Sequence, residues 1–493
     1  MNFNHFTSIK SILFDNKTVK QTIFKNTFWL TVSTVINKLL ALGLIIYAAR
    51  ILGAEGYGKF TFALAFVSLL MIFSDFGLSA IVTREFAREK EKKEEFYSII
   101  SLKVLLAFGT FILILLASFL AVPEKDTQTI ILILALFFLA NSFIGICYSF
   151  FHARQKMEYE AWFETLQILM ISGLGFLVLF KFPSLENLSY AYFFAALTAL
   201  IFVLFFFHFK IFPLKIEWNF LVWKKFLSMS WPLALIGLFG AIYSYTDSVM
   251  LGYWNMMRET GWYNAAYKIV MAGLIPMGLI GASFYPALSK FSKESKEKFQ
   301  KAWDYELEIM ILLSLPLVVS GMVLGPKIIY SFYPFDFSPS ILAFQILILT
   351  AGIIFLYRPF YDAMIVLNQQ AKTFWITIAG AVTNVILNLI LIPKYSLYGA
   401  AVATVITNFL ILLIIIFFTR KFTFIRFPVL KIFFTFLIST VALVIMYFII
   451  KQPLIYNINI FLLVFAGAAI YFMVFFTIKK LCLKILKTKK LSL

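Results

Sequence analysis

Cysteine and histidine are scarce in this chain of 493 residues. The two cysteines, Cys147 and Cys482, lie far apart in the sequence, and the three histidines, His5, His152 and His208, are equally scattered. A disulfide framework needs paired cysteines, and a metal site needs several ligands at close spacing. The sequence indicates neither, and we expect no metal and no resident cofactor.

Charge is scarce as well. Charged residues make up 14% of the chain, against about 25% in a typical soluble domain. Hydrophobic residues make up 62%, and the mean hydropathy is +0.92, which excludes a water-soluble fold. Apolar runs of about 20 residues recur from end to end, and each is long enough to cross a hydrocarbon core about 30 Å thick. We therefore predict an all-α polytopic membrane protein.

The apolar runs predict about fourteen transmembrane helices. The ninth run begins with the acidic residues Asp304, Glu306 and Glu308. The predicted limits are 26–49, 59–82, 98–121, 128–151, 161–181, 188–209, 228–252, 262–288, 304–326, 338–357, 372–392, 397–418, 429–450 and 458–478.

Basic residues are distributed unevenly between these runs. Most of the 43 Lys and Arg residues fall at the termini and in the even-numbered connections, and we assign only Lys38 and Lys268 to the interior of spans. Because positive loops stay in the cytoplasm, we predict a multi-pass protein of the cytoplasmic membrane with both termini cytoplasmic. The net charge of +19 then fits anionic lipid heads, and it requires no nucleic acid.

One phrase occurs twice. Residues 52–60 (LGAEGYGKF) are echoed loosely by 251–252 and 259–264, and the same offset separates Gly56 from Gly261 and Phe86 from Phe291. A shared offset indicates a duplicated unit, and an even number of spans in each copy indicates parallel repeats. The predicted organisation is a cytoplasmic segment 1–25, an N-lobe 26–210 with helices 1 to 6, a linker 211–227, a C-lobe 228–420 with helices 7 to 12, two further helices within 429–478, and a basic tail 479–493.

Three stretches of the sequence resemble a known family. Residues 49–58 (ARILGAEGYG), followed by DFGL at 75–78 and REFAR at 84–88, are similar to the N-terminal signature of the polysaccharide biosynthesis (oligosaccharide flippase) family. Residues 384–394 with 398–404, and residues 245–252, give looser matches. That family belongs to the multidrug/oligosaccharidyl-lipid/polysaccharide exporter superfamily.

The resemblance implies a flippase, and not an enzyme, with a MATE-like fold of two six-helix lobes around a cavity that opens alternately to each side. The implied substrate is a polyprenyl-diphosphate-linked glycan for cell-surface polysaccharide. The implied partners are membrane lipids and polysaccharide-assembly enzymes, with H⁺ or Na⁺ as candidate coupling ions. Alternatives are a peptidoglycan lipid II-type flippase, a cation-coupled multidrug antiporter, and a membrane glycosyltransferase or polymerase. The last is disfavoured because no connection is long enough for a catalytic domain.

Ionisable residues inside spans are the candidates for the substrate or ion path, because each costs about 2.5–3.5 kcal/mol at mid-membrane. By helical rise, Lys38 and Asp75 lie deep in the first two spans, where they could meet. Lys38 would attract the diphosphate and Asp75 would hold an ion or gate Lys38. The alternative is a permanent structural ion pair. Asp247 and Lys268 form a shallower constellation for which we favour a structural role.

Arg358 and Asp362, beside Pro359, form a third candidate cluster near the end of the tenth span. Arginine suits phosphate, although a solvated helix end also explains the pair. Asn37 and Asn141 are polar positions within spans that either bond between helices or face the cavity.

Overall fold

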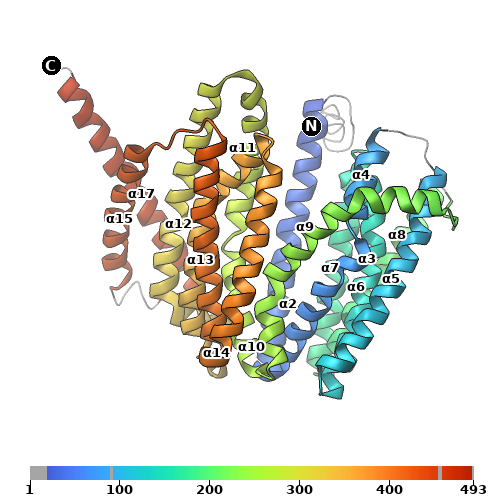
Figure 1. The fold of residues 1–493 in the computed structure, drawn as a ribbon. Coiled ribbons are helices and arrows are strands. Elements are labelled where there is room, and N and C mark those ends of the chain that lie inside the picture. The colour runs from blue at the N-terminus through green and yellow to red at the C-terminus, as the bar shows by residue number, and fades with distance from the viewer. Residues whose placement is uncertain (1–18, 89–92, 212, 453–457, 491–493) are drawn as a thin grey trace, which may run out of the picture. The chain divides into compact units, whose positions relative to one another are not determined.

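The computed structural model describes residues 19–88, 93–211, 213–452 and 458–490, and every regular element in these ranges is a helix. Long helices run beside one another within each part of the chain (Figure 1). Twelve of them are long and apolar enough to cross a membrane. This confirms the prediction of an all-α polytopic membrane protein. Most of the predicted segment 1–25 lies outside the described residues.

Two of the twelve helical stretches are longer than one span requires, and the count of fourteen spans stays a prediction. Lys25–Arg88 has 64 residues and Gln370–Phe422 has 53, whereas about 20 residues cross a bilayer. Each contains a residue with non-helical dihedrals, Gly53 (φ 69°, ψ 177°) in the first and Ser396 (φ 52°, ψ −133°) in the second. Both lie between spans that the sequence predicts separately, and each stretch is long enough to cross twice.

The chain divides at Gly261 into two units. Unit 1 therefore includes α9, which packs on α2, α4 and α5. The predicted boundary in the linker 211–227 describes the sequence repeat and stays a prediction. The helices of unit 1 are α2 (Val19–Leu70), α3 (Ile72–Asp75), α4 (Leu78–Arg88), α5 (Lys93–Ala121), α6 (Lys125–Ala153), α7 (Met157–Lys181), α8 (Leu185–Lys210), α9 (Phe220–Tyr253) and the first residues of α10 (Met257–Ala272).

Unit 2 begins within α10 and is built around α12 and α13. Helix α12 packs against α11, α13, α15 and α17, and α13 also packs on α14. The elements of unit 2 are α11 (Ile275–Glu294), α12 (Lys296–Phe332), the short 3₁₀ helix η1 (Phe335–Phe337), α13 (Ser340–Val366), α14 (Gln370–Phe422), α15 (Val429–Ile450) and α17 (Ile460–Lys490).

Aromatic rings fill one part of the core of unit 1. Phe86 of α4, Phe96 of α5, Phe150 of α6 and Phe207 of α8 are all buried, and their ring centroids lie 5.3–6.0 Å apart where they meet. Edge-to-face and offset pairs of this kind add about 0.5–1.5 kcal/mol beyond area burial. Phe86 is one of the residues that recur at the repeat offset, and in unit 1 its position is one of core packing.

The two glycine-rich phrases meet within unit 1. A Cβ atom on Gly58 would lie 1.7 Å from the carbonyl oxygen of Met257, and one on Gly261 would lie 2.0 Å from that of Ala54. Only residues without a side chain allow two helix backbones to approach this closely. The phrases therefore form a close contact between α2 and α10.

An ion pair stands at the start of α6, between two candidate spans. Lys59 donates to Glu124 over 2.5 Å, and Thr127 donates to the same carboxylate over 2.7 Å. Burial alone would raise the pKa of Glu124, but the hydrogen bonds from Lys59 and Thr127 bring this pKa below its ordinary value. The pair links the kinked α2 to α6.

The glycine contact gives a stability prediction. We expect Gly261→Ala to destabilise the folded protein by roughly 1–3 kcal/mol, because the added methyl forces two backbones apart. The measurement is thermal unfolding of the purified full-length protein in detergent. Gly109→Ala is the matched control, since a Cβ on Gly109 of α5 meets nothing within 4 Å. Equal melting temperatures for the two variants would contradict this account.

Candidate functional site

Asp75 lies at a break in a membrane-length stretch of unit 1. It ends α3, and the next two residues, Phe76 (φ 49°) and Gly77 (φ 75°), have left-handed dihedrals. A Cβ on Gly77 would lie 2.8 Å from the carbonyl oxygen of Ser230 in α9. The DFG phrase at 75–77 therefore supplies a sharp break against which α9 packs closely.

The Asp75 carboxylate binds a lysine from another helix. Lys103 of α5 donates to it over 2.8 Å, and the hydroxyl of Ser79 donates over 2.5 Å. The Lys103 side chain is 0% exposed, whereas that of Asp75 is 31% exposed. A buried ammonium ion without a partner would cost several kcal/mol, so this pair holds α5 to the helix break.

The sequence suggested that Asp75 and Lys38 could meet, and the structure pairs Asp75 with Lys103 instead. Lys103 takes that place, because it lies on the face of α5 that packs against α3. The assignment of only Lys38 and Lys268 to span interiors is therefore wrong. Lys103 falls five residues inside the predicted span 98–121, and it belongs with the lysines of the span interiors.

Lys38 itself is exposed on α2. Within the described ranges it has no hydrogen-bond or ion-pair partner. An ammonium group in this position, on a helix long enough to cross the bilayer, is unusual because desolvation disfavours it. It is therefore available to a ligand.

Polar side chains connect α2 to α7 and α6 beside Lys38. Asn37 donates to the Ser33 hydroxyl over 3.0 Å, and Ser33 donates to Glu164 of α7 over 3.0 Å. One helical turn further along α7, Gln167 donates to Asn141 of α6 over 2.7 Å. Asn141 thus accepts a hydrogen bond from another helix, whereas Asn37 donates within α2, and a position facing the cavity stays a prediction for both. Glu164 was missed because it lies near the start of a predicted span.

The other predicted charges lie as follows. Asp247 is 6% exposed on α9, and Lys268 is half-buried on α10. Their predicted constellation joins a residue of unit 1 to one of unit 2 and stays a prediction.

In unit 2, Arg358 donates to Asp362 over 2.7 Å along α13, and Asp362 is 2% exposed. The sequence located Glu306 at the start of the ninth span but did not single it out as a site residue. It is buried on α12, next to this pair.

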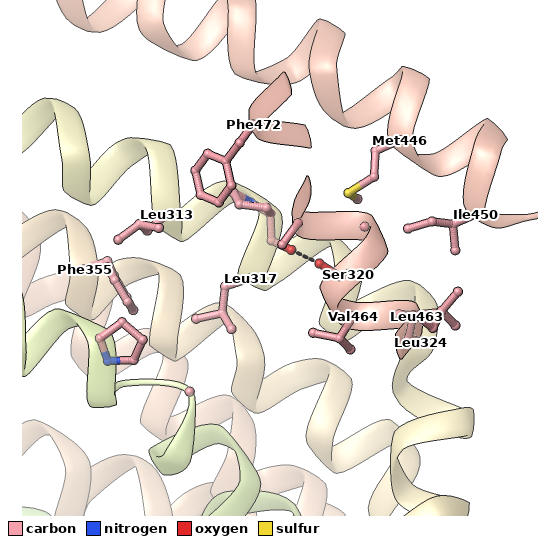
Figure 2. A pocket seen from close by; sticks show the side chains of 15 residues that line it. Leu313, Leu317, Ser320, Leu324, Phe355, Met446, Ile450, Leu463, Val464 and Phe472 are labelled. Atoms are coloured by element: carbon pink, nitrogen blue, oxygen red, sulfur yellow. Dashed lines mark hydrogen bonds between the residues drawn. The ribbon is translucent and has the colours of Figure 1, made fainter. Parts of the chain in front are cut away.

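Unit 2 also contains an apolar groove between α11, α12, α13, α15 and α17 (Figure 2). Its cavity measures about 190 Å³ and continues into a neighbouring cavity of about 300 Å³ that shares Leu317, Leu324 and Val464. Ser320 is the one hydroxyl in the first cavity, and it donates to the backbone of Pro316. The groove therefore suits a hydrocarbon ligand.

Together, the fold and these polar groups define a polytopic membrane protein with charged residues inside membrane-length helices. Residues 23–292 match the model of the family described as polysaccharide biosynthesis protein. The chain belongs to this family, as its sequence signature indicated.

Individual relatives agree with this family. "Capsular polysaccharide biosynthesis protein CapF" of Staphylococcus aureus is 22% identical over 80% of this chain and 99% of its own length. "Probable low-salt glycan biosynthesis flippase Agl15" of Haloferax volcanii is 23% identical over 74% of this chain and 76% of its own length. The solved structure of the lipid II flippase MurJ, in an inward closed conformation, shares the fold with a TM-score of 0.77 at 17% identity, over 92% of this chain and 98% of that one.

The Asp75–Lys103 pair gives a second prediction. We expect Asp75→Asn to lower the stability of the fold by about 3–5 kcal/mol, because it leaves Lys103 buried without a counter-charge. Thermal unfolding measures the effect. Adding Lys103→Met to Asp75→Asn should restore most of the loss, since no charge then remains buried. A double variant as unstable as Asp75→Asn alone would show that the charge pairing is not the cause.

Proposed function

We propose that the chain is a flippase that moves a lipid-linked oligosaccharide across the cytoplasmic membrane by alternating access, for cell-surface polysaccharide assembly. The family and the named functions of the relatives support this proposal. Both termini are placed in the cytoplasm on the distribution of Lys and Arg, and polysaccharide-assembly enzymes are the proposed partners. The activity is transport of an intact glycan without bond cleavage, so the protein is not an enzyme.

The observation that carries the proposal is Lys38. A diphosphate crossing the membrane needs cationic groups in its path, because its charge is not stable in hydrocarbon. Lys38 is exposed on a membrane-length helix and has no partner among the described residues. Asn37, the preceding residue, and the Ser33 and Glu164 groups that hydrogen bonds connect to it offer further hydrogen-bonding groups for a polar head. These features together suit an anionic, hydroxyl-rich ligand.

The apolar groove of unit 2 supports the lipid part of the same substrate. Its walls come from helices that the sequence placed in the C-lobe and from α15 and α17, which have no counterpart in the repeat. A polyprenyl chain gains about 0.8 kcal/mol for each methylene that it removes from water. In a bilayer the gain is smaller, so the groove contributes mainly by positioning the tail.

Lys38 provides the direct test. We expect Lys38→Ala to reduce surface glycan at least tenfold, which corresponds to the loss of about 1.4 kcal/mol of binding or more, while protein abundance stays unchanged. Lys38→Arg should retain most of the output, because it keeps the positive charge. Lys181→Ala, which removes an exposed lysine at the end of α7, is the matched control. Normal glycan output from Lys38→Ala would remove Lys38 from the path and with it the principal support for the proposal.

The groove gives a separate test. Val464 lines it and is 48% exposed, whereas the adjacent Phe465 of α17 is 75% exposed and does not line it. We expect Val464→Trp to lower surface glycan several-fold by filling the groove, and Phe465→Trp to have no effect. Quantification of surface glycan at matched protein abundance checks both. Equal output from the two variants would show that the groove does not hold the lipid.

A further inference from the structure

Glu306 is a fully buried acid in unit 2. It lies on α12, one turn after Trp303, and its exposed fraction is 0%. Neither of its carboxylate oxygens has a hydrogen-bond partner in the described part of the chain. An ionised carboxylate in this state is very costly, so such a group is stable only with a counter-charge or with a proton.

A second carboxyl and one guanidinium stand beside it. Asp362 and Arg358 of α13 both act electrostatically on Glu306, and the Arg358 Nε donates to the Asp362 Oδ2 over 2.7 Å. The Trp303 Nε1 donates to the backbone oxygen of Pro359 over 3.1 Å, which fixes α12 against this part of α13. The arrangement therefore places two acids around one permanent cation.

Helix α11 closes the cluster from a third side. A Cβ on Gly281 would lie 3.2 Å from both the Arg358 Nη2 and the Asp362 Oδ2. The backbone of α11 thus lies directly over the ion pair. Arg358 is 32% exposed and Asp362 is 2% exposed, so Arg358 connects the buried acids to the surface.

Asp362 and Arg358 are the charged groups that act on Glu306 within the described ranges, and nearby charges have partners of their own. Lys431 of α15 and Lys479 of α17 bind Glu308, Lys290 of α11 binds Glu294, and Lys372 of α14 donates to Gln369. Asp304, on the same helix as Glu306, accepts from Gln300. Tyr357 and Tyr361 add only neutral hydroxyls near Arg358.

We propose that Glu306 and Asp362 bind one proton between them and that Arg358 holds the remaining negative charge. With both acids ionised, the cluster would carry a net charge of −1 in a buried site. Two carboxyl groups that share a site retain a proton for this reason. The bound proton also supplies the missing donor, because two carboxylates cannot hydrogen-bond to each other, whereas a carboxylic acid donates to a carboxylate.

The proposed ligand of this site is a single proton, shared by Glu306 and Asp362. On the proposed function, from which this step follows, the proton is the coupling ion. Its release would leave the net charge of −1 between α11, α12 and α13, and this charge would favour a conformation in which water reaches the cluster. Binding of the next proton would restore the packed arrangement.

Infrared spectroscopy of the purified full-length protein in lipid nanodiscs tests the proton directly. The probe is the absorption of protonated carboxyl groups, identified by its shift in heavy water and followed from about pH 5 to pH 9. We expect Glu306→Gln to remove the signal of one protonated carboxyl from the wild-type spectrum at neutral pH. Asp362→Asn should remove the same signal, because Arg358 then neutralises Glu306. Asp304→Asn, on the same helix, should leave it unchanged.

Arg358→Met provides the opposite change. Without the guanidinium, both acids should be protonated, so the signal should grow by one carboxyl. Unchanged spectra for both Glu306→Gln and Asp362→Asn would overturn the proposal and show that both acids are ionised. Glutamine and asparagine keep the size of the acids, and thermal unfolding of each variant confirms that it is folded. The infrared signal does not depend on transport. A failure of the proton proposal would therefore leave the flippase proposal standing, and the converse also holds.

Discussion

An ionised side chain inside a membrane-length helix must be neutralised locally, and the charged sites of this protein follow from that requirement. In unit 1, Lys103 is completely buried and Asp75 is its counter-ion. At the start of α7, the buried Glu158 and Lys25 are joined over 2.9 Å in the same way. Each pair fixes the rotation of two helices about their axes, because a side chain that turned toward lipid would lose its partner. Two helices hold the break after Asp75 in place. Helix α5 does so through the ion pair, and α9 does so through its close packing on Gly77.

The two units meet this requirement differently. In unit 1, the Asp75–Lys103 and Lys25–Glu158 pairs each join one acid to one base, and they need no proton or ligand to become neutral. In unit 2 a single guanidinium, that of Arg358, serves two buried acids. Such a cluster changes its charge by one when a proton enters or leaves, whereas a matched pair does not. Lys38 is the opposite case, because it is a cation that no ion pair neutralises among the described residues. The unmatched groups, more than the paired ones, are therefore where substrate and ion are expected to act.

Much of this fold could be predicted from the sequence, because a bilayer permits few alternatives. The lengths of the apolar runs predicted the helices. The repeated glycine phrase contains Gly53, where the backbone of α2 has non-helical dihedrals. The partner of Asp75 could not be predicted, since it depends on which face of α5 turns inward, and hydropathy contains no such information for a helix that is apolar all round. Glu306 was missed for a related reason. At the start of a predicted span it resembled a solvated helix end, but α12 begins ten residues earlier, at Lys296, and buries it. The groove depends on α15 and α17 packing on α12, which no repeat indicated.

The backbone contact between Gly58 and Gly261 has a consequence for biosynthesis. These residues are separated by about 200 positions, and a ribosome adds roughly 5–20 residues per second. The second half of α2 therefore waits about 10–40 s in the membrane before its partner has been made. During this interval the Gly58 surface offers an exposed small-residue face to any other helix in the bilayer. Nascent chains of this protein should accordingly need protection by the insertion machinery until residue 261 has emerged, and truncation before that point should leave α2 without its native neighbour.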